Sequence, residues 1–349
     1  MSRERLAFID WLKAIGITLV VYGHVAGWTI NEYFPPIFPK QLGVALFVFV
    51  AGYSLASERR PVGTVVVRRL FEIVFVGALF AVLLSLIGLA VDGGARLSNF
   101  TPLAFGANVL VNNFPANPTT WYIGTYIHLI VAWALLFRHV TVTTPVLLGT
   151  LAVEIAVRAY AWEHLGGFQA YMLLPNWLGC FLLGRAAGQA AIGGRETPVK
   201  GGALGWTLVV AGLVWLIAQP ALGIPLDMFG PFRPVTGGTS AGMRVVLSAA
   251  VSTLYLGTCW GLYHLTRRLG PSRAAEFLSA QTVFVFVAHM PVMYALDPLM
   301  ADWSMAAQSA VRILVCYGLM AVASMYFRRL VPVTALRDRV LTWMGAAAA

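Results

Sequence analysis

Ten apolar stretches of about 17 to 22 residues run through the sequence and are separated by short polar connections. About 20 apolar residues in a helix span the hydrocarbon core of a bilayer. Hydrophobic residues make up 59 % of the chain and charged residues only 11 %, too few to coat a water-soluble enzyme. We therefore expect an all-α polytopic membrane protein, with about ten transmembrane helices in one bundle. The predicted spans are residues 9–29, 41–57, 70–91, 119–137, 143–161, 171–190, 204–221, 244–265, 277–296 and 308–327.

The basic residues predict the orientation of these spans. If the N-terminus lies in the cytoplasm and the sides alternate, 17 of the 24 lysines and arginines fall in or beside cytoplasmic segments. Only Lys40, Arg96 and Arg233 fall in the opposite loops. Cytoplasmic loops carry such an excess of positive charge, so we predict that both termini are cytoplasmic. The same rule accounts for the net charge of +10, and we expect no nucleic-acid partner.

Residues 1–349 are expected to form a single transmembrane domain without a fused soluble domain. We find no internal repeat and no low-complexity tract apart from the final alanines. Arg3 and Arg5 precede the first apolar stretch, as in a signal peptide. Because Lys13 interrupts that stretch and nine further spans follow, we expect a retained helix.

Three ionisable residues, Asp10, Lys13 and His24, lie in the first predicted helix. Lys13 and His24 are 11 residues apart, which leaves them within about 20° of one azimuth and about 16 Å apart along the axis. One helix face thus presents an ammonium near the cytoplasmic rim and an imidazole three turns deeper. Asp10 lies one turn before Lys13 and can pair with it. Such residues are costly in a bilayer and usually functional, although Lys13 can also snorkel and His24 can serve as an interhelical hydrogen bonder.

This pattern resembles the first helix of the acyltransferase 3 family of membrane acyltransferases. The family's mark is a basic residue, ten arbitrary residues and a histidine, and Lys13 and His24 fit that spacing. The Asp-x-x-Lys form that begins at Asp10 is most similar to the branch that includes fucose 4-O-acetylase-like proteins.

Three further segments resemble the same family. Leu46–Tyr53 is similar to its Phe-Phe-x-x-Ser-Gly-Tyr/Phe segment, with Ala51 in place of the usual serine. Thr120–Ile123 is similar to its Trp-Tyr/Phe-Leu segment, and Val283–Met293 to its late His-x-Pro helix. The resemblance covers essentially the whole chain, and ten spans is the family's number.

The resemblance implies transfer of an acyl group, usually acetyl, from a cytoplasmic acyl-CoA to a hydroxyl on the far side of the membrane. We therefore expect acyl-CoA, in particular acetyl-CoA, as co-substrate and no metal. The expected acceptor is a glycan or lipid-linked sugar of the cell envelope. The expected location is the lipid bilayer of the bacterial inner membrane.

The charge of the donor suggests where it binds. The nucleotide end of acyl-CoA is highly charged, and cytoplasmic arginines suit its phosphates. Lys13 can meet a phosphate or stand at the mouth of the pore. The positive-inside rule alone also explains these arginines, and Glu72 is placed to pair with Arg68. The candidate donor-binding residues are Arg68, Arg69, Arg267 and Arg268, within a wider set that includes Arg59, Arg60 and Arg273.

Four residues on the opposite side are candidates for binding the acceptor. Trp121 and Tyr122 open the fourth span at its outer rim, where they form either a stacking wall for a sugar or an interfacial aromatic belt. Glu32 and Asn113 lie in polar outer loops that suit hydrogen bonding to a hydroxylated ligand. Turn chemistry is the simpler explanation of those loops.

Acyl transfer to a hydroxyl needs a base for its proton, and a neutral imidazole suits that role. His24 is our candidate, either as base or as the acceptor of a transient acyl group. If the ninth span begins near Glu276, His289 lies about 18 Å along it, at a depth similar to that of His24. The two imidazoles can then flank one reaction centre. His128, in the fourth span, is expected to be an interhelical hydrogen bonder.

The main alternative is a secondary transporter or a lipid-linked glycan flippase. Asp10, Glu154 and Arg312 lie in predicted spans and can serve ion transport. No inverted repeat and no matching pair of broken helices supports that alternative. A membrane receptor or binding module without chemistry is a third possibility, and two deep histidines argue mildly against it.

Overall fold

The computed structural model describes residues 6–25, 39–94, 96–111, 113, 115–193, 206–214 and 240–345. Every regular element among these residues is helical, which confirms the prediction of an all-α chain for this part of the protein. The contacts divide the chain into two compact units. Unit 1 comprises Met1–Ser57 and Val140–Ala280, and unit 2 comprises Glu58–His139 and Gln281–Ala349.

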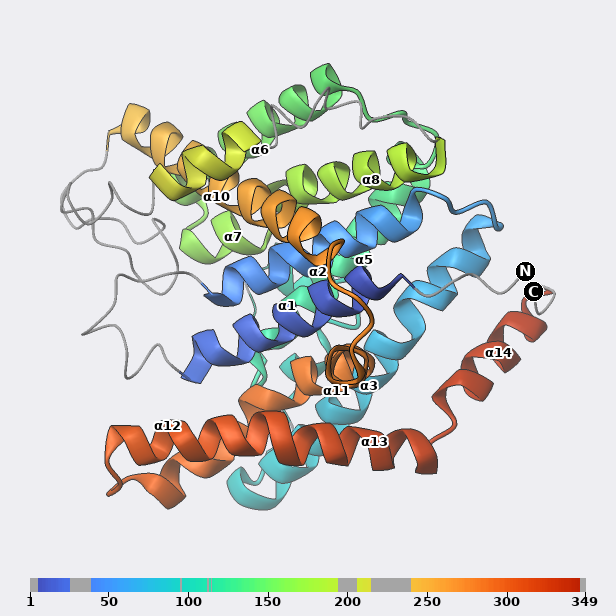
Figure 1. Ribbon diagram of the computed structural model, residues 1–349. Helices are drawn as coiled ribbons and strands as arrows, with labels where there is room; N and C mark the ends of the chain where they lie inside the picture. Colours follow the sequence, from blue (N-terminus) through green and yellow to red (C-terminus); the bar gives the residue numbers. More distant parts are fainter. Residues whose placement is uncertain are drawn as a thin grey trace. The chain divides into compact units, whose positions relative to one another are not determined.

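Unit 1 contains the N-terminal helices and the middle of the chain (Figure 1). Its labelled elements are α1 (Ala7–Val25), α2 (Pro39–Leu55), α6 (Thr144–His164), α7 (Gly167–Met172), η5 (Leu174–Trp177), α8 (Leu178–Gly193) and α10 (Ala241–Thr266).

Unit 2 contains the long third helix, the segment that follows it, and the C-terminal helices, of which α11 begins in the last residues of unit 1. Its elements are α3 (Val62–Asp92), η2 (Leu97–Phe100), α4 (Ala107–Leu110), η3 (Pro118–Thr120), α5 (Trp121–Ala132), η4 (Trp133–Phe137), α11 (Arg273–Leu296), η7 (Asp297–Met300), α12 (Met305–Ile313), η8 (Leu314–Leu319), α13 (Met320–Leu330) and α14 (Val333–Trp343).

Seven helices in the described part of the chain are long and apolar enough to cross a membrane, and each coincides with a predicted span. They are Ala7–Val25, Val62–Val91, Pro118–Phe137, Thr144–His164, Ala241–Thr266, Arg273–Met300 and Met305–Leu330. The span predicted at 41–57 is a shorter apolar helix, Lys40–Leu55. The span at 171–190 is divided among α7, η5 and α8, and the span at 204–221 is described only over 206–214. The count of ten and the cytoplasmic termini stay predictions.

The third helix begins eight residues earlier than predicted, at Val62 instead of residue 70. Pro61 immediately precedes its first turn, a position that suits proline, and the following residues contain no helix breaker. Arg68 and Arg69 therefore lie within α3 rather than in the connection before it. These first two turns lie outside the predicted span because Arg68 and Arg69 lower the mean hydropathy there.

Backbone-to-backbone packing through glycines joins α1, α2 and α8, which lie side by side in Figure 1. A Cβ atom at Gly43 would lie 2.4 Å from the carbonyl oxygen of Gly16 on α1. On the other face of α2, a Cβ at Gly52 would lie 2.0 Å from the carbonyl oxygen of Phe181. Small residues allow such close approach where helices associate inside a membrane. Gly52 belongs to the Leu46–Tyr53 segment, and its lack of a side chain allows α8 to pack closely against α2.

Side chains of α8 also hold the ends of neighbouring elements. Arg185 Nη1 donates to the carbonyl oxygen of Leu55 at 3.0 Å and so satisfies an acceptor at the end of α2. Gln189 Nε2 donates to the carbonyl oxygen of Val140 at 3.0 Å, and its Oε1 accepts from the backbone N–H of Val142. Arg185 itself is buried within unit 1, with 3 % of its surface exposed.

In unit 2, buried asparagines build the segment between α3 and α5. Asn99 Nδ2 donates to Ser85 Oγ at 3.1 Å, while its Oδ1 accepts from the backbone N–H of Ala116 at 3.0 Å. Asn117 caps η3 by accepting from the backbone N–H of Thr119 at 3.2 Å. The cap by Asn117 is local turn chemistry, whereas Asn99 joins the end of α3 to the residues before η3.

Candidate active site

The polar residues of α1 are placed in unit 1. Asp10 is buried, with 5 % of its surface exposed, and Lys13 and His24 are half-buried. All three residues lie on the continuous helix α1, so the predicted rise of about 16 Å separates Lys13 from His24 along its axis. His24 lies in the last described turn of α1, and the predicted continuation to residue 29 lies outside the described residues.

A hydrogen bond to the backbone determines the tautomer of His24. Its Nδ1 lies 2.9 Å from the carbonyl oxygen of Val20. Because a carbonyl oxygen can only accept, Nδ1 carries the proton. In the neutral ring, Nε2 then holds the lone pair, which is the form needed for a general base.

The N-terminal half of α1 packs against the C-terminal end of α10 within unit 1. The indole Nε1 of Trp11 donates to the carbonyl oxygen of Gly270 at 2.9 Å, and the rings of Phe8 and Tyr263 lie 5.5 Å apart at their centroids. The guanidinium of Arg267 lies 5.4 Å from the centroid of Tyr263 and donates to its hydroxyl at 3.3 Å. The structure therefore brings Arg267 to the end of α1 that carries Asp10 and Lys13. The next residue, Arg268, is exposed.

His289 is fully buried in α11, and its backbone bonds match those of His24. Its Nδ1 lies 2.8 Å from the carbonyl oxygen of Phe286 and 3.1 Å from that of Val285. Nδ1 is again the donor, so the lone pair of the neutral ring is on Nε2. His289 lies 16 residues after the start of α11 at Arg273, about 24 Å along the helix rather than the 18 Å that we expected from a start near Glu276.

An aromatic contact in unit 2 links His289 to the predicted acceptor side. The His289 ring lies 6.1 Å from that of Phe286, which in turn lies 5.1 Å from that of Tyr122. Tyr122 is only 6 % exposed and also stacks on Tyr126 at 5.7 Å. Tyr122 is therefore packed inside the unit, which does not fit a ring in an interfacial belt. Trp121 is half-buried with its ring edge on Tyr122 at 5.9 Å.

The structure says less about Asn113 and Glu32, the other two candidates for binding the acceptor. Asn113 is half-buried, and its backbone N–H donates to the carbonyl oxygen of Asn108 at 3.1 Å. Glu32 lies outside the described residues. His128 donates through Nε2 to the carbonyl oxygen of Phe105 at 2.9 Å. Phe105 lies in the turn before α4, so this bond is not the interhelical one expected from the sequence.

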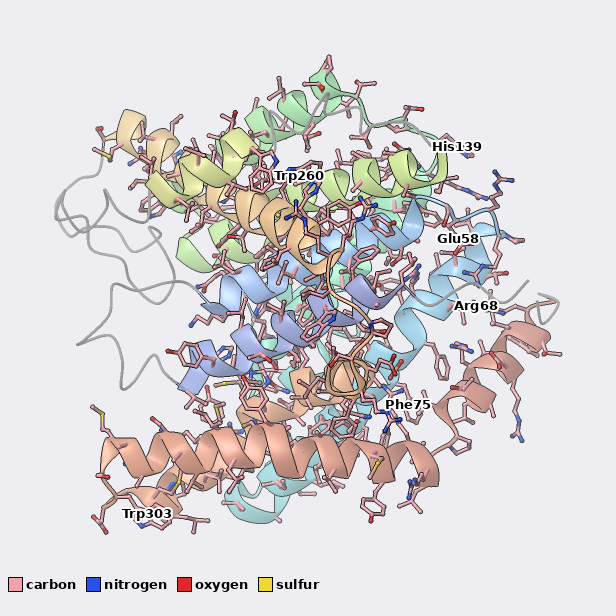
Figure 2. All side chains as sticks on the ribbon, viewed as in Figure 1. Glu58, Arg68, Phe75, His139, Trp260 and Trp303 are labelled. Atoms are coloured by element: carbon pink, nitrogen blue, oxygen red, sulfur yellow. The ribbon has the colours of Figure 1, made fainter. Side chains whose placement is uncertain are left out.

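The predicted donor cations of unit 2 lie at the start of α3, where Figure 2 labels Arg68, with Glu58 in the connection before it. Arg68 and Arg69 are half-buried in the second turn. Glu72 forms an ion pair with Arg328 of α13 at 2.5 Å. Glu72 and Arg328 lie 256 residues apart, so the spacing within α3 could not predict their pairing.

Arg60 is held by a neighbouring acid. Its Nε donates to Glu58 Oε1 at 2.8 Å, its backbone N–H donates to the same oxygen at 3.1 Å, and a second guanidinium nitrogen pairs with Oε2. The side-chain hydrogen bond from Arg60 lowers the pKa of the Glu58 carboxyl from 4.5 to about 2. This pairing makes Arg60 a weaker candidate for the donor phosphates than Arg68 or Arg69.

Unit 1 contains a buried ion pair that we did not predict from the sequence. Arg158 Nη2 donates to Glu154 Oε1 at 2.7 Å, and both side chains are 1 % exposed. Ser252 of α10 donates to the same Oε1 at 2.6 Å, and the backbone N–H of Gly179 donates to Oε2 at 2.9 Å. Arg158 also reaches the carbonyl oxygens of Ser248 and Asn176. The spacing of four residues between Glu154 and Arg158 was the signal that could have revealed the pair.

The sequence candidates fall in two groups that follow the two units. Asp10, Lys13, His24, Arg267 and Arg268 lie in unit 1. Unit 2 holds the others that are described: Arg68, Arg69, Asn113, Trp121, Tyr122 and His289. A reaction centre shared by His24 and His289 therefore stays a prediction.

Comparison with known proteins supplies the family. No curated protein and no solved structure matches the chain. The model of the acyltransferase 3 family, described as an acyltransferase domain, matches residues 6–329. That match includes both units and nearly the entire chain. Together with seven helices able to cross a membrane, it shows a multi-pass membrane protein. The chain belongs to the acyltransferase 3 family of membrane acyltransferases.

Proposed function

We propose that the protein is an integral membrane O-acyltransferase that transfers an acyl group, acetyl in particular, from cytoplasmic acyl-CoA to a hydroxyl of a cell-envelope or exported glycan. The observation that carries the proposal is the state of the two histidines. His24 and His289 each donate Nδ1–H to their own helix backbone, which leaves the Nε2 lone pair as the basic site. Membership of the family supplies the acyl-transfer class of the reaction.

The reaction exchanges one ester for another. In direct transfer, the acceptor oxygen attacks the thioester carbonyl carbon while His24 Nε2 takes the hydroxyl proton. The carbon–sulfur bond then breaks, the acyl group remains on the acceptor oxygen, and the proton passes to the thiolate of CoA. In the alternative, Nε2 attacks the thioester carbon and the carbon–sulfur bond breaks, which releases the CoA thiolate. The acceptor oxygen then takes the acyl group from Nε2, and the hydroxyl proton passes to the thiolate. His289, whose neutral ring also carries its lone pair on Nε2, is the second candidate for the base.

The positive charge of four arginines suggests where acyl-CoA binds. Arg68 and Arg69 in unit 2 and Arg267 and Arg268 in unit 1 provide cations for the nucleotide phosphates. Lys13, with Asp10 one turn before it on α1, meets the phosphate or pantetheine end of the donor. The acyl group then lies three turns beyond Lys13, near His24.

The acceptor is proposed to be a sugar hydroxyl, in line with the likeness of the first helix to fucose 4-O-acetylase-like proteins. Trp121 offers a partly open ring next to Tyr122, and sugars stack well on such rings. Asn113 and Glu32 supply polar groups for hydroxyls. A glycan or lipid-linked sugar on the outer face of the bacterial inner membrane has the required chemistry.

The transporter alternative is weakened by the pairing of two of its charges. Glu154 is bound by Arg158, Ser252 and a backbone N–H. Arg312 donates to Asp297 Oδ1 at 2.6 Å and to Gln308 Oε1 at 3.1 Å. Removing either partner would leave a buried charge without its counterion, so these pairs have a structural role in holding the chain together.

The test uses the purified full chain in lipid nanodiscs with acetyl-CoA labelled in the acetyl group. Release of free CoA thiol and movement of label into an added glycan or lipid extract support the proposal. Accumulation of label on the protein alone indicates an acyl-histidine. Ion- or sugar-dependent uptake into proteoliposomes, without any release of CoA from acetyl-CoA, would establish the transporter instead.

A further inference from the structure

Pro291 leaves one carbonyl of α11 without its usual helical partner. Proline has no N–H, so the carbonyl oxygen four residues earlier, at Val287, cannot receive the normal backbone bond. Val287 lies two residues before His289 and is 1 % exposed. A buried carbonyl in this position needs another donor.

Asn117 supplies that donor from the other side of unit 2. Its Nδ2 lies 2.6 Å from the carbonyl oxygen of Val287, and the side chain is buried with only 2 % of the residue exposed. The bond connects residues 170 positions apart in the sequence. It ties η3, at the entrance to α5, to the part of α11 that carries His289.

The orientation of the Asn117 amide is fixed by its other contacts. Oδ1 accepts from Thr119 Oγ1 at 2.6 Å and from the backbone N–H of Thr119 at 3.2 Å. Both are donors in these bonds, so this atom must be the oxygen and Nδ2 must face Val287. The backbone carbonyl of Asn117 in turn accepts from Thr120 Oγ1 at 2.7 Å.

Side-chain donors thus occupy three successive carbonyls of α11. His289 Nδ1 bonds to Val285 and Phe286, and Asn117 bonds to Val287. The course of the helix at Pro291 therefore depends on Asn117, and the direction of the His289 ring depends on that same turn. Trp121 and Tyr122 follow Asn117 by four and five residues. The bond from Asn117 to Val287 therefore positions both the His289 imidazole and this aromatic pair.

We propose that Asn117 is a positioning residue for His289 and acts through the carbonyl of Val287. Only one part of this inference rests on the proposed function, namely that His289 takes part in acyl transfer. Its structural content is that the orientation of the His289 ring depends on Asn117, through the turn of α11 whose carbonyls hold Nδ1.

The test separates two functions of the Asn117 side chain, the hydrogen bond from Nδ2 to Val287 and the capping of η3 by Oδ1. In Asn117→Ser, the hydroxyl can still cap η3, but it is too short to reach Val287. We expect turnover to fall about 10- to 100-fold with little change in KM for acetyl-CoA, as for a misplaced reacting group. Asn176→Ser is the matched control, because Asn176 is also buried and donates Nδ2 to a backbone carbonyl, at Gln169 in unit 1.

A second variant gives the helix its own donor. Pro291→Ala restores an N–H that can bond to Val287, so Asn117→Ser should cost much less turnover in that background. Equal losses in both backgrounds would show that Asn117 does not act through Val287 and would overturn the inference.

A readout independent of activity keeps the inference distinct from the proposed function. Nitrogen-15 NMR of histidine-labelled protein in micelles reports the Nδ1–H tautomer of His289, assigned by its loss in His289→Gln. Asn117→Ser should shift this signal and its titration, and Pro291→Ala should restore them. An unchanged His289 signal in folded Asn117→Ser overturns the positioning role even if acyl transfer is established. A shifted signal in a chain that transfers no acyl group upholds it while the proposed function fails.

Discussion

His24 and Val20 are joined by a hydrogen bond of 2.9 Å from the imidazole Nδ1–H to the carbonyl oxygen one turn earlier in α1. The bond determines which nitrogen can accept a proton, so it bears directly on the first prediction. Glutamine in place of His24 can keep a hydrogen bond to the backbone but cannot take a proton near neutral pH. His24→Gln and His24→Ala should fold and bind acyl-CoA, yet lose acyl transfer by about 10²- to 10⁴-fold.

Thermal unfolding in detergent, equilibrium binding of labelled acyl-CoA and CoA release measure the three properties separately. His164→Gln is the control, because this histidine lies half-exposed at the end of α6 against Tyr160. A rate near wild type in folded His24→Gln would make His24 structural. The role of base would then pass to His289, or the enzyme proposal would fail.

The second prediction concerns the donor cations of α3. Replacing Arg68 and Arg69 together by alanine should raise KM and weaken binding of acyl-CoA, while turnover at saturating donor stays largely intact. Arg337→Ala with Arg339→Ala removes the same charge from α14 and should have little effect on binding. Donor titrations of CoA release decide the matter. Lower turnover with unchanged donor binding speaks against this role for Arg68 and Arg69.

The sequence predicted the helices well because each span leaves a long apolar signal, independent of its neighbours. It also predicted Lys13 and His24 together, because their relation lies within one helix and follows from 3.6 residues per turn. The structure adds one fact that no helical wheel contains, namely that a backbone carbonyl holds Nδ1 of His24.

Contacts between distant segments were beyond the sequence. The role of Asn117 could not be predicted, since its partner Val287 lies 170 residues away. Glu154 was considered as an ion carrier, yet Arg158, Ser252 and Gly179 surround it. A local pattern gives the type of a side chain and its helix face, whereas its partner depends on which helices pack together.

The third prediction is a pH dependence that arises at Glu58. Its folded-state pKa of about 2 lies below the ordinary value of 4.5, so ionised Glu58 stabilises the folded state. That contribution is complete above pH 4.5 and is lost as the pH falls through the range from 4.5 to about 2. Glu58→Gln should be less stable than wild type at pH 6, and the difference should shrink below pH 4.5. Thermal unfolding in detergent at several pH values measures this, and a difference independent of pH contradicts it.

The fourth prediction concerns the buried pair in unit 1. Arg158→Met leaves the carboxylate of Glu154 without its cation, which should lower the free energy of unfolding by about 3–5 kcal/mol. Glu154→Leu combined with Arg158→Met removes both charges and should cost less than either single change. Denaturation of the three variants in detergent gives the coupling. Simple additivity would mean that Glu154 and Arg158 do not stabilise each other.

The last prediction tests the glycine contact between α2 and α8. A Cβ atom at Gly184 would lie 2.0 Å from the carbonyl oxygen of Phe49, a backbone atom that cannot move aside without shifting the helix. Gly184→Ala should therefore lower the free energy of unfolding by at least about 1–3 kcal/mol, the usual cost of overpacking. Gly149→Ala is the matched control, because Gly149 also lies within a helix, α6, and a Cβ there meets no atom within 4 Å. Since alanine favours helices over glycine, the control should be neutral or slightly stabilised. Thermal unfolding of both variants in the same detergent makes the comparison, and equal stability of the two would exclude close backbone packing at Gly184.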